Sequence, residues 1–310
     1  MKKLALLISV ILYGLPGLAQ NSIIEPSVTC LYATKDSTDL YMDLYYPEDG
    51  SEGKATIIFA FGGGFKFGHK REEKALKWFR HLTSDGFTVA AIDYRLGLKD
   101  FKVTGISKAL IDALEKSISM ATEDLLCATD FLIRNREMLG IDTSRIIAGG
   151  TSAGAITALQ AEWEICNGTE AASILPEGFN YAGVISWSGA IYNRKGGPVY
   201  EKAPCPTVFF HGMKDNIVTY NKIQLGKRYF GGTGALTKQY EKSGFNYNVY
   251  RYPDRGHEVA GTMESSYFEV MRFIESNVLQ GERRIVDAIV TDPTLVVPDW
   301  AKNGLKGLMN

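Results

Sequence analysis

The stretch Ala148-Gly-Gly-Thr-Ser-Ala-Gly-Ala155 decides the fold, because it holds a G-x-S-x-G pentapeptide between an apolar run and a helical pattern. A serine hydroxyl becomes an effective nucleophile when a sharp strand-to-helix turn holds it exposed, and only small residues can flank it there. Gly150, Ala153 and Gly154 meet that requirement. The pattern therefore predicts a strand ending before Ser152, a helix beginning after it, and a candidate nucleophile at Ser152.

Short β-rich runs alternate with helical patterns along the rest of the chain, which is typical of an α/β fold with a mostly parallel sheet and helices on both faces. A polar stretch at 96–118 is expected to precede a long helix, and the tail at 281–310 has no clear periodicity. The expected strands are a hairpin within 28–46 and runs at 55–60, 87–93, 145–148, 181–187, 207–210 and 247–252. The expected helices are 72–85, 121–138, 153–165, 221–243 with an interruption at Gly231-Gly232, and 262–279.

The first nineteen residues have the pattern of a secretory signal peptide. Lys2 and Lys3 precede an apolar stretch from Leu4 to Leu15, and small residues end at Ala19. The stretch is shorter than the roughly 20 apolar residues that span a bilayer, so an uncleaved membrane anchor is the weaker interpretation. We expect cleavage ahead of Gln20, export to the periplasm or the medium, and no stable membrane insertion afterwards. Residues 20–280 then form one catalytic domain, and 281–310 form an extension of unassigned role.

Composition excludes one class of partner. The 34 Lys and Arg residues nearly balance 35 Asp and Glu, and no basic stripe is present that could neutralise a row of phosphates, so a nucleic-acid partner is not expected. The four cysteines do not have the spacing of a zinc site. Cys127 lies in an apolar helical pattern and is expected to be buried, whereas a disulfide between Cys166 and Cys205 is left open.

Candidates for the base and the orienting acid lie beyond Ser152. His257 follows the last predicted strand in a loop, where an imidazole can reach across the sheet edge, whereas His211 directly ends a strand. We therefore favour His257 as the base and expect His211 to pack or hydrogen-bond at the strand end. Asp215 lies in the loop after the preceding strand and is the favoured acid, because Asp254 and Glu258 adjoin His257 in sequence and would have to bend back sharply.

The segment Phe61-Gly-Gly-Gly-Phe65 follows a predicted buried strand. Three glycines leave backbone N–H groups unshielded, so Gly63 and Gly64, with the N–H of Ala153, are candidates for an oxyanion hole. A phosphate-binding loop is the competing interpretation, but neither of the usual glycine patterns for it is present. Trp187, Phe65 and Tyr192 are candidates either for an acyl pocket or for the core, while Arg95 and Asp124 are expected to form a structural pair.

Together these motifs resemble the α/β-hydrolases, and among them the secreted carboxylesterases of the hormone-sensitive-lipase-like and acetyl or feruloyl esterase types. Phe61-Gly-Gly-Gly64 is similar to their His-Gly-Gly-Gly oxyanion motif, with Phe61 in place of histidine, and Asp93-Tyr-Arg-Leu96 to their Asp-Tyr-Arg-Leu segment. The order Ser152, Asp215, His257 is also the order of that fold. The similarity covers roughly residues 40–279.

The resemblance implies a serine carboxylesterase that works through an acyl-enzyme and requires no metal or organic cofactor. It implies short acyl or aromatic ester substrates, either small molecules or esters linked to carbohydrate. Two other interpretations stay open: a serine peptidase similar to the prolyl oligopeptidases, for whose propeller domain the chain has no room, and a non-catalytic binding protein on a hydrolase scaffold. The sequence indicates no oligomeric state.

Overall fold

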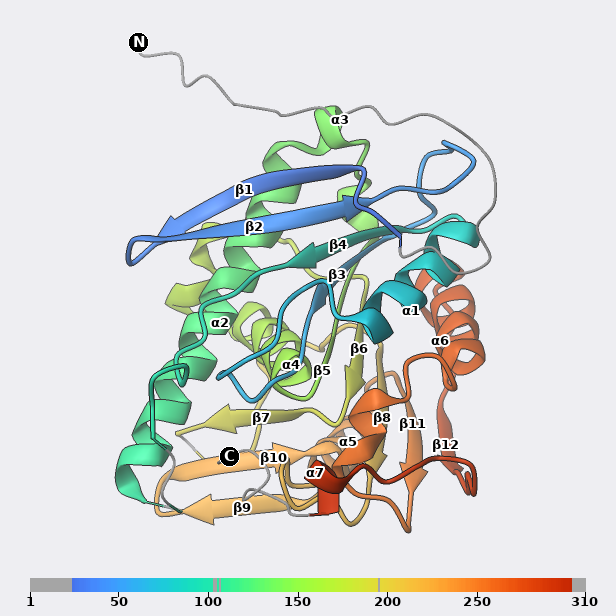
Figure 1. Ribbon diagram of the computed structural model, residues 1–310. Coiled ribbons are helices and arrows are strands. Elements are labelled where there is room, and N and C mark those ends of the chain that lie inside the picture. The colour runs from blue at the N-terminus through green and yellow to red at the C-terminus, as the bar shows by residue number, and fades with distance from the viewer. Residues whose placement is uncertain (1–23, 103–104, 106, 195, 303–310) are drawn as a thin grey trace.

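The computed structural model describes residues 24–102, 105, 107–194 and 196–302, and within these ranges it confirms the predicted α/β class. Nine strands form the central sheet in the order β1-β2-β4-β3-β5-β6-β8-β11-β12, and every neighbouring pair from β4 to β12 is parallel (Figure 1). The strands are β1 (Val28–Lys35), β2 (Thr38–Tyr45), β3 (Thr56–Ala60), β4 (Thr88–Ile92), β5 (Ile146–Thr151), β6 (Gly183–Trp187), β8 (Thr207–Gly212), β11 (Tyr247–Tyr252) and β12 (Val286–Ile289).

Helices cover both faces of this sheet. On one face α2 and α4 contact each other, and α4 also contacts β3, β5 and β6; α1 and α6 lie on the other face (Figure 1). The helices are α1 (Glu73–Ser84), α2 (Lys108–Arg134), α3 (Arg136–Leu139), α4 (Ala153–Cys166), α5 (Thr233–Ser243), α6 (Tyr267–Phe273) with a π-helical continuation at Ile274–Leu279, and α7 (Asp299–Lys302). Short 3-10 turns occupy Thr143–Arg145, Glu170–Ile174 and His257–Gly261.

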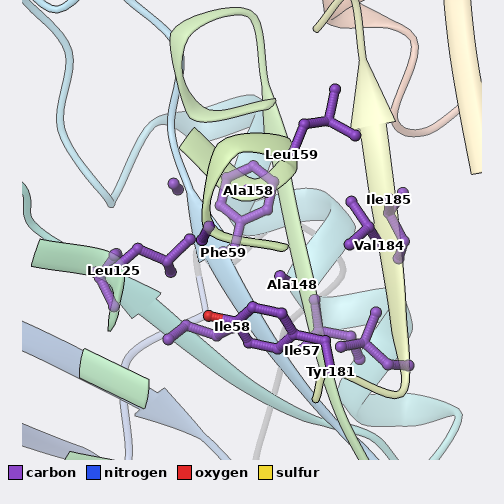
Figure 2. Close-up of a cluster of buried hydrophobic side chains, with 14 of the residues drawn as sticks. Ile57, Ile58, Phe59, Leu125, Ala148, Ala158, Leu159, Tyr181, Val184 and Ile185 are labelled. Carbon is purple, nitrogen blue, oxygen red and sulfur yellow. The ribbon is translucent and has the colours of Figure 1, made fainter. Parts of the chain in front are cut away.

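The core lies between the sheet and its helices. Strands β3, β4, β5, β6 and β8 are buried along their whole length, as expected for parallel strands covered on both faces. Figure 2 shows Ile58 of β3, Leu125 of α2 and Leu159 of α4 within one such cluster. Because full burial of an aliphatic side chain is worth about 1.5–3 kcal/mol, this continuous core fixes the strand ends that carry the site.

Two predicted helices differ from the structure. The long helix α2 begins at Lys108 rather than near residue 121, because Ser107 caps it by accepting a hydrogen bond from Leu110 N. Its first turns escaped prediction because charged residues alternate there with the apolar ones, although Ala113 and Leu114 pack against the core. Asp112 and Glu115 form ion pairs with Arg228. The predicted closing helix at 262–279 forms only from Tyr267 onward.

A small second sheet was also missed. It has the order β7-β10-β9, with β7 at Ala190–Asn193, β9 at Lys222–Leu225 and β10 at Arg228–Gly232. The predicted helix at 221–243 is therefore wrong in its first half, and α5 begins at Thr233. All four residues of β9 are exposed, and its polar–apolar alternation is too short to distinguish a strand from part of a helix. Gly232 allows the backbone of β10 to pass close to Thr219, since a Cβ at position 232 would lie 1.7 Å from Thr219 O.

Two further expectations are resolved by the described residues. The tail is not featureless, because β12 extends the central sheet beside β11. The open disulfide between Cys166 and Cys205 is not formed, and both cysteines are free and buried. Each contacts the buried Glu162 instead: its Oε1 accepts hydrogen bonds from Cys205 N at 2.7 Å and from Cys166 Sγ at 3.4 Å. Cys127 is buried, as expected.

Candidate active site

Ser152 lies on the sharp turn between β5 and α4. Its φ of +51° is in the left-handed region, which L-residues rarely adopt and which is characteristic of a nucleophile elbow. The flanking glycines are required by close packing against β3. A Cβ at Gly150 would lie 2.6 Å from Ala60 O, and one at Gly154 would lie 2.0 Å from the same oxygen. The turn is therefore sterically possible only with the glycines that the sequence supplies.

The structure brings Ser152, His257 and Asp215 into one hydrogen-bonded chain. Ser152 Oγ lies 2.8 Å from His257 Nε2, and His257 Nδ1 lies 2.7 Å from Asp215 Oδ2. His257 occupies a turn after β11 and Asp215 a loop after β8, so all three residues follow the carboxyl ends of central strands. All three are buried, and Ser152 is 8% exposed. This geometry allows a proton to pass from Ser152 to His257 while Asp215 orients the imidazole.

Asp215 is held as a carboxylate by four hydrogen bonds. The amides of Ile217 and Val218 donate to Oδ1 at 2.9 Å, and His257 and His211 both donate to Oδ2. Burial alone would raise the pKa of Asp215, but the hydrogen bonds from His211 and His257 outweigh that effect and hold the pKa well below its usual range. The carboxylate is therefore charged at any pH at which His257 can act as a base.

The rival residues lie elsewhere. His211 is fully buried on β8, 3.2 Å from Asp215, and does not contact Ser152. Asp254 forms an exposed ion pair with Lys214, and Glu258 accepts a hydrogen bond from Gly256 N at 3.0 Å. The hydrogen bonds that connect Ser152 to a base and an acid thus run through His257 and Asp215.

The glycine segment after β3 lies beside the nucleophile. A Cβ at Gly62 would lie 3.5 Å from Ser152 Cβ. Gly63 and Gly64 have φ values of +111° and +62°, and Gly63 O accepts hydrogen bonds from the amides of Lys66 and Phe67. Within the described part of the chain, the amides of Gly63, Gly64 and Ala153 have no hydrogen-bond acceptor. They are therefore available to an added oxyanion.

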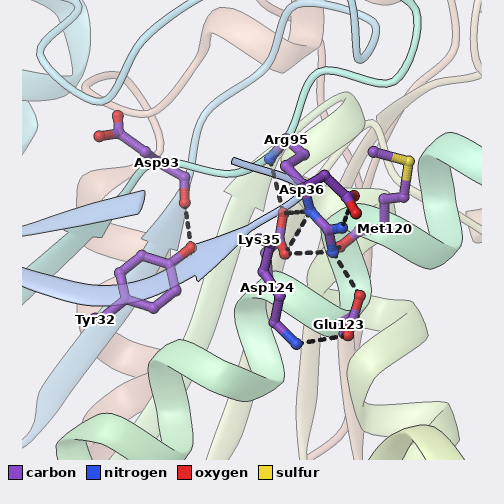
Figure 3. Close-up of polar contacts among 8 residues, drawn as sticks. All are labelled: Tyr32, Lys35, Asp36, Asp93, Arg95, Met120, Glu123 and Asp124. Atoms are coloured by element: carbon purple, nitrogen blue, oxygen red, sulfur yellow. Dashed lines mark hydrogen bonds and ion pairs between the residues drawn. The ribbon is translucent and has the colours of Figure 1, made fainter. Parts of the chain in front are cut away.

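The segment Asp93-Tyr94-Arg95 anchors this glycine loop to the rest of the fold. Tyr94 donates a hydrogen bond to Phe61 O at 2.8 Å, and its ring stacks on that of Phe61 at 4.4 Å. Arg95 binds Asp124 of α2 through its Nε and through its backbone N, which confirms the expected structural pair (Figure 3). The hydrogen bond from Tyr94 to the loop was not predicted from the sequence.

The aromatic candidates for an acyl pocket belong mainly to the core. Trp187 is fully buried, stacks on Phe210 at 5.5 Å and donates from Nε1 to Ser266 Oγ. Phe65 is 1% exposed and packs edge-on against Tyr94. Tyr192 is 8% exposed on β7. None of the three has the exposure expected of an open substrate pocket.

Comparison with known proteins agrees with this topology. The family model described as BD-FAE matches residues 42–190, which include the nucleophile turn but neither Asp215 nor His257. Among solved structures, the apo form of Thermogutta terrifontis esterase 2 has a TM-score of 0.60 and 18% identity, covering 83% of this chain and 97% of that one. The same esterase with propionate bound has a TM-score of 0.59 and 17% identity, covering 80% and 93%. At 17% and 18% identity, this structural similarity establishes a shared fold.

Two curated proteins match part of the sequence. The non-reducing polyketide synthase ausA of Emericella nidulans is 30% identical over 145 residues, which is 46% of this chain. The non-reducing polyketide synthase trt4 of Aspergillus terreus is 27% identical over 150 residues, or 48% of this chain. This chain spans 6% of the length of each. Taken together, the sheet order and the structural neighbours show that this chain has the α/β-hydrolase fold. The family model that matches part of it is BD-FAE.

Proposed function

We propose that this α/β-hydrolase is a serine carboxylesterase. The observation that carries the proposal is the hydrogen-bonded chain from Ser152 Oγ through His257 to Asp215, with distances of 2.8 and 2.7 Å. The proposal assigns Ser152 as nucleophile, His257 as general base and then general acid, and Asp215 as the group that fixes the imidazole tautomer. Gly63, Gly64 and Ala153 are the proposed oxyanion donors. The matched BD-FAE family and the esterase structural neighbours support this assignment.

The proposed reaction has two steps. His257 Nε2 removes the proton from Ser152 Oγ as that oxygen attacks the ester carbonyl, and the resulting oxyanion accepts hydrogen bonds from the free backbone amides. His257 then returns the proton to the departing alcohol, which leaves Ser152 acylated. Water, deprotonated by the same imidazole, releases the acid and restores the serine. Asp215 stays ionised throughout and stabilises the imidazolium that forms in each step.

The proposed substrates are short-chain acyl or aromatic esters, including esters carried on carbohydrate. Support for short acyl groups comes from the solved structures of the neighbouring esterase with propionate and with butyrate bound. That esterase is also phosphonylated by cyclosarin. An organophosphorus probe is therefore a suitable reagent for this chain as well.

The deciding experiment combines a fluorophosphonate probe with a substrate panel. We expect the probe to label wild-type protein at Ser152 and to leave folded Ser152→Ala unlabelled, which separates an enzyme from a binding protein on the same scaffold. We expect hydrolysis of p-nitrophenyl acetate and butyrate, and little cleavage of peptide p-nitroanilides. Faster cleavage of the anilides would favour a peptidase, and an unlabelled, inactive wild type would overturn the proposal.

A further inference from the structure

His211 makes contacts that a packing residue would not need. Its side chain is fully buried at the end of β8, and Nε2 lies 3.2 Å from Asp215 Oδ2 and 3.1 Å from Val218 O. On the other side of the ring, Nδ1 lies 2.8 Å from Thr233 Oγ1, at the first residue of α5. Every polar atom of this imidazole therefore has a partner, and one partner is the candidate triad acid.

These partners determine where the proton of His211 lies. A carboxylate and a carbonyl oxygen both face Nε2, and neither can donate, so Nε2 must carry the hydrogen. The hydroxyl of Thr233 can donate, so it supplies the hydrogen bond that Nδ1 accepts. Asp215 and Val218 thus select the tautomer in which His211 donates to Asp215, and Thr233 holds the ring in place by donating to Nδ1.

The contact also completes the restraint on Asp215. Two backbone amides fix Oδ1, whereas Oδ2 would otherwise have His257 as its single donor. With His211 in place, donors from β8, the acid loop and the His257 turn define the plane of the carboxylate. A carboxylate fixed in this way keeps Oδ2 directed at His257 Nδ1 whether that imidazole is neutral or protonated.

We propose that His211, oriented by Thr233, is a positioning residue for the acid of the triad. The proposal rests on the function proposed above, since it describes how the same site keeps its geometry. His211 does not touch the substrate or the reacting atoms. It acts through Asp215, so its loss is expected to lower turnover with little effect on substrate binding.

Kinetics of four variants test this role. Thr233→Val removes the hydroxyl while nearly preserving shape, and kcat for p-nitrophenyl acetate should fall about fivefold with KM within about twofold, because one hydrogen bond contributes about 1 kcal/mol. Thr233→Ser should restore kcat. His211→Leu should lower kcat about 100-fold, since it removes the donor itself, and His211→Gln should recover part of the loss because its amide can still donate.

A matched control separates positioning from stability. Thr129→Val removes another buried threonine hydroxyl. Thr129 is on α2, and its Oγ1 lies 2.7 Å from Tyr181 Oη. It should lower the free energy of unfolding by a similar amount and leave kcat unchanged. If Thr233→Val and Thr129→Val have the same kcat per folded molecule, or if folded His211→Leu keeps turnover within about twofold of wild type, the positioning role is wrong.

Nuclear magnetic resonance tests the same proposal without turnover. In protein with ¹⁵N-labelled histidine, His211 should appear as the Nε2–H tautomer, and Thr233→Val should shift its Nδ1 resonance because the hydrogen bond to that atom is lost. The low-field signal of the His257 Nδ1 proton should shift in Thr233→Val and in His211→Leu. An Nδ1–H tautomer in wild type would refute the proposal. A wild type that hydrolyses no ester but shows the expected signals would overturn the proposed esterase function alone and leave the positioning of Asp215 standing.

Discussion

The hydroxyl of Tyr94 donates a hydrogen bond of 2.8 Å to the carbonyl oxygen of Phe61, so the second residue after β4 is hydrogen-bonded to the first residue of the glycine loop. The loop is held there through this backbone carbonyl and by the stacked rings of Phe61 and Tyr94. The consequence is that Tyr94, although it does not touch Ser152, should affect catalysis.

Replacement of Tyr94 by phenylalanine tests this link. The change leaves the buried Phe61 carbonyl without its donor, which should destabilise the fold by about 1–2 kcal/mol. The loop should also become less ordered, and kcat for p-nitrophenyl acetate should fall about tenfold with little change in KM. Urea unfolding and steady-state kinetics measure the two effects.

Tyr45→Phe is the matched control. The Tyr45 hydroxyl is buried on β2 and has no hydrogen-bond partner within the described part of the chain, so its removal should change neither kcat nor stability by much. Equal kinetic losses in the two variants would contradict a specific role for Tyr94.

Mutation of the nucleophile and the base should give non-additive losses. Ser152→Ala and His257→Ala should each lower kcat on the order of 10⁶-fold, and the double variant should be little worse than either, because the two residues act in one step. Single-turnover assays on purified, folded protein measure this. A double loss equal to the product of the single losses would show that the two residues act independently.

The low pKa of Asp215 predicts how stability depends on pH. An unfolded aspartate titrates near about 3.9, whereas folded Asp215 titrates well below that value. The ionised form therefore adds stability that is fully present above the unfolded pKa and is lost as the pH falls toward the folded pKa. The difference in unfolding free energy between wild type and Asp215→Asn should be constant above about pH 5 and should shrink at lower pH. A difference that widens on acidification would be inconsistent with the hydrogen bonds described.

The mass of the exported protein tests whether the signal peptide is cleaved. The lysine start, the short apolar run and Ala19 predict a mature chain that begins at Gln20, although these residues lie outside the described ranges. Intact-mass measurement on protein recovered from the periplasm or the medium should show this N-terminus. Recovery of the full-length chain from those fractions would refute cleavage.

Local patterns predicted that Ser152, Asp215 and His257 would lie together better than they predicted the elements around them. The nucleophile turn is encoded by adjacent glycines that the approach of β3 requires, and the order of Ser152, Asp215 and His257 follows from loops after strands. These signals lie within a few residues of each functional group. The part played by Thr233 could not be predicted, because it meets His211 only through the packing of α5 on β8.

The missed elements share a physical cause. Strand β9 is wholly exposed and only four residues long, and the first turns of α2 mix apolar residues with charged groups that pair across the fold, so neither stretch stands out in the sequence as a buried element. Arg194 and Arg228 pair with Glu115 across a long sequence separation. Such ion pairs cannot be predicted from the sequence, because the paired residues come together only in the folded chain. They connect the start of α2 to the small sheet.

Arg95 provides the last prediction. Its side chain is 8% exposed and binds the fully buried Asp124, and it also reaches the exposed Asp36 (Figure 3). Arg95→Met leaves the Asp124 carboxylate without its counter-charge, which should cost about 3–5 kcal/mol of unfolding free energy. Adding Asp124→Asn should recover much of this loss, because the neutral amide can still accept a hydrogen bond from the backbone N–H at position 95. Asp36→Ala should cost less than about 1 kcal/mol, since that partner is exposed. Urea titration of wild type and the three variants measures these unfolding free energies. Equal losses for Arg95→Met and Asp36→Ala would show that the buried Arg95–Asp124 pair adds no more stability than the exposed pair with Asp36.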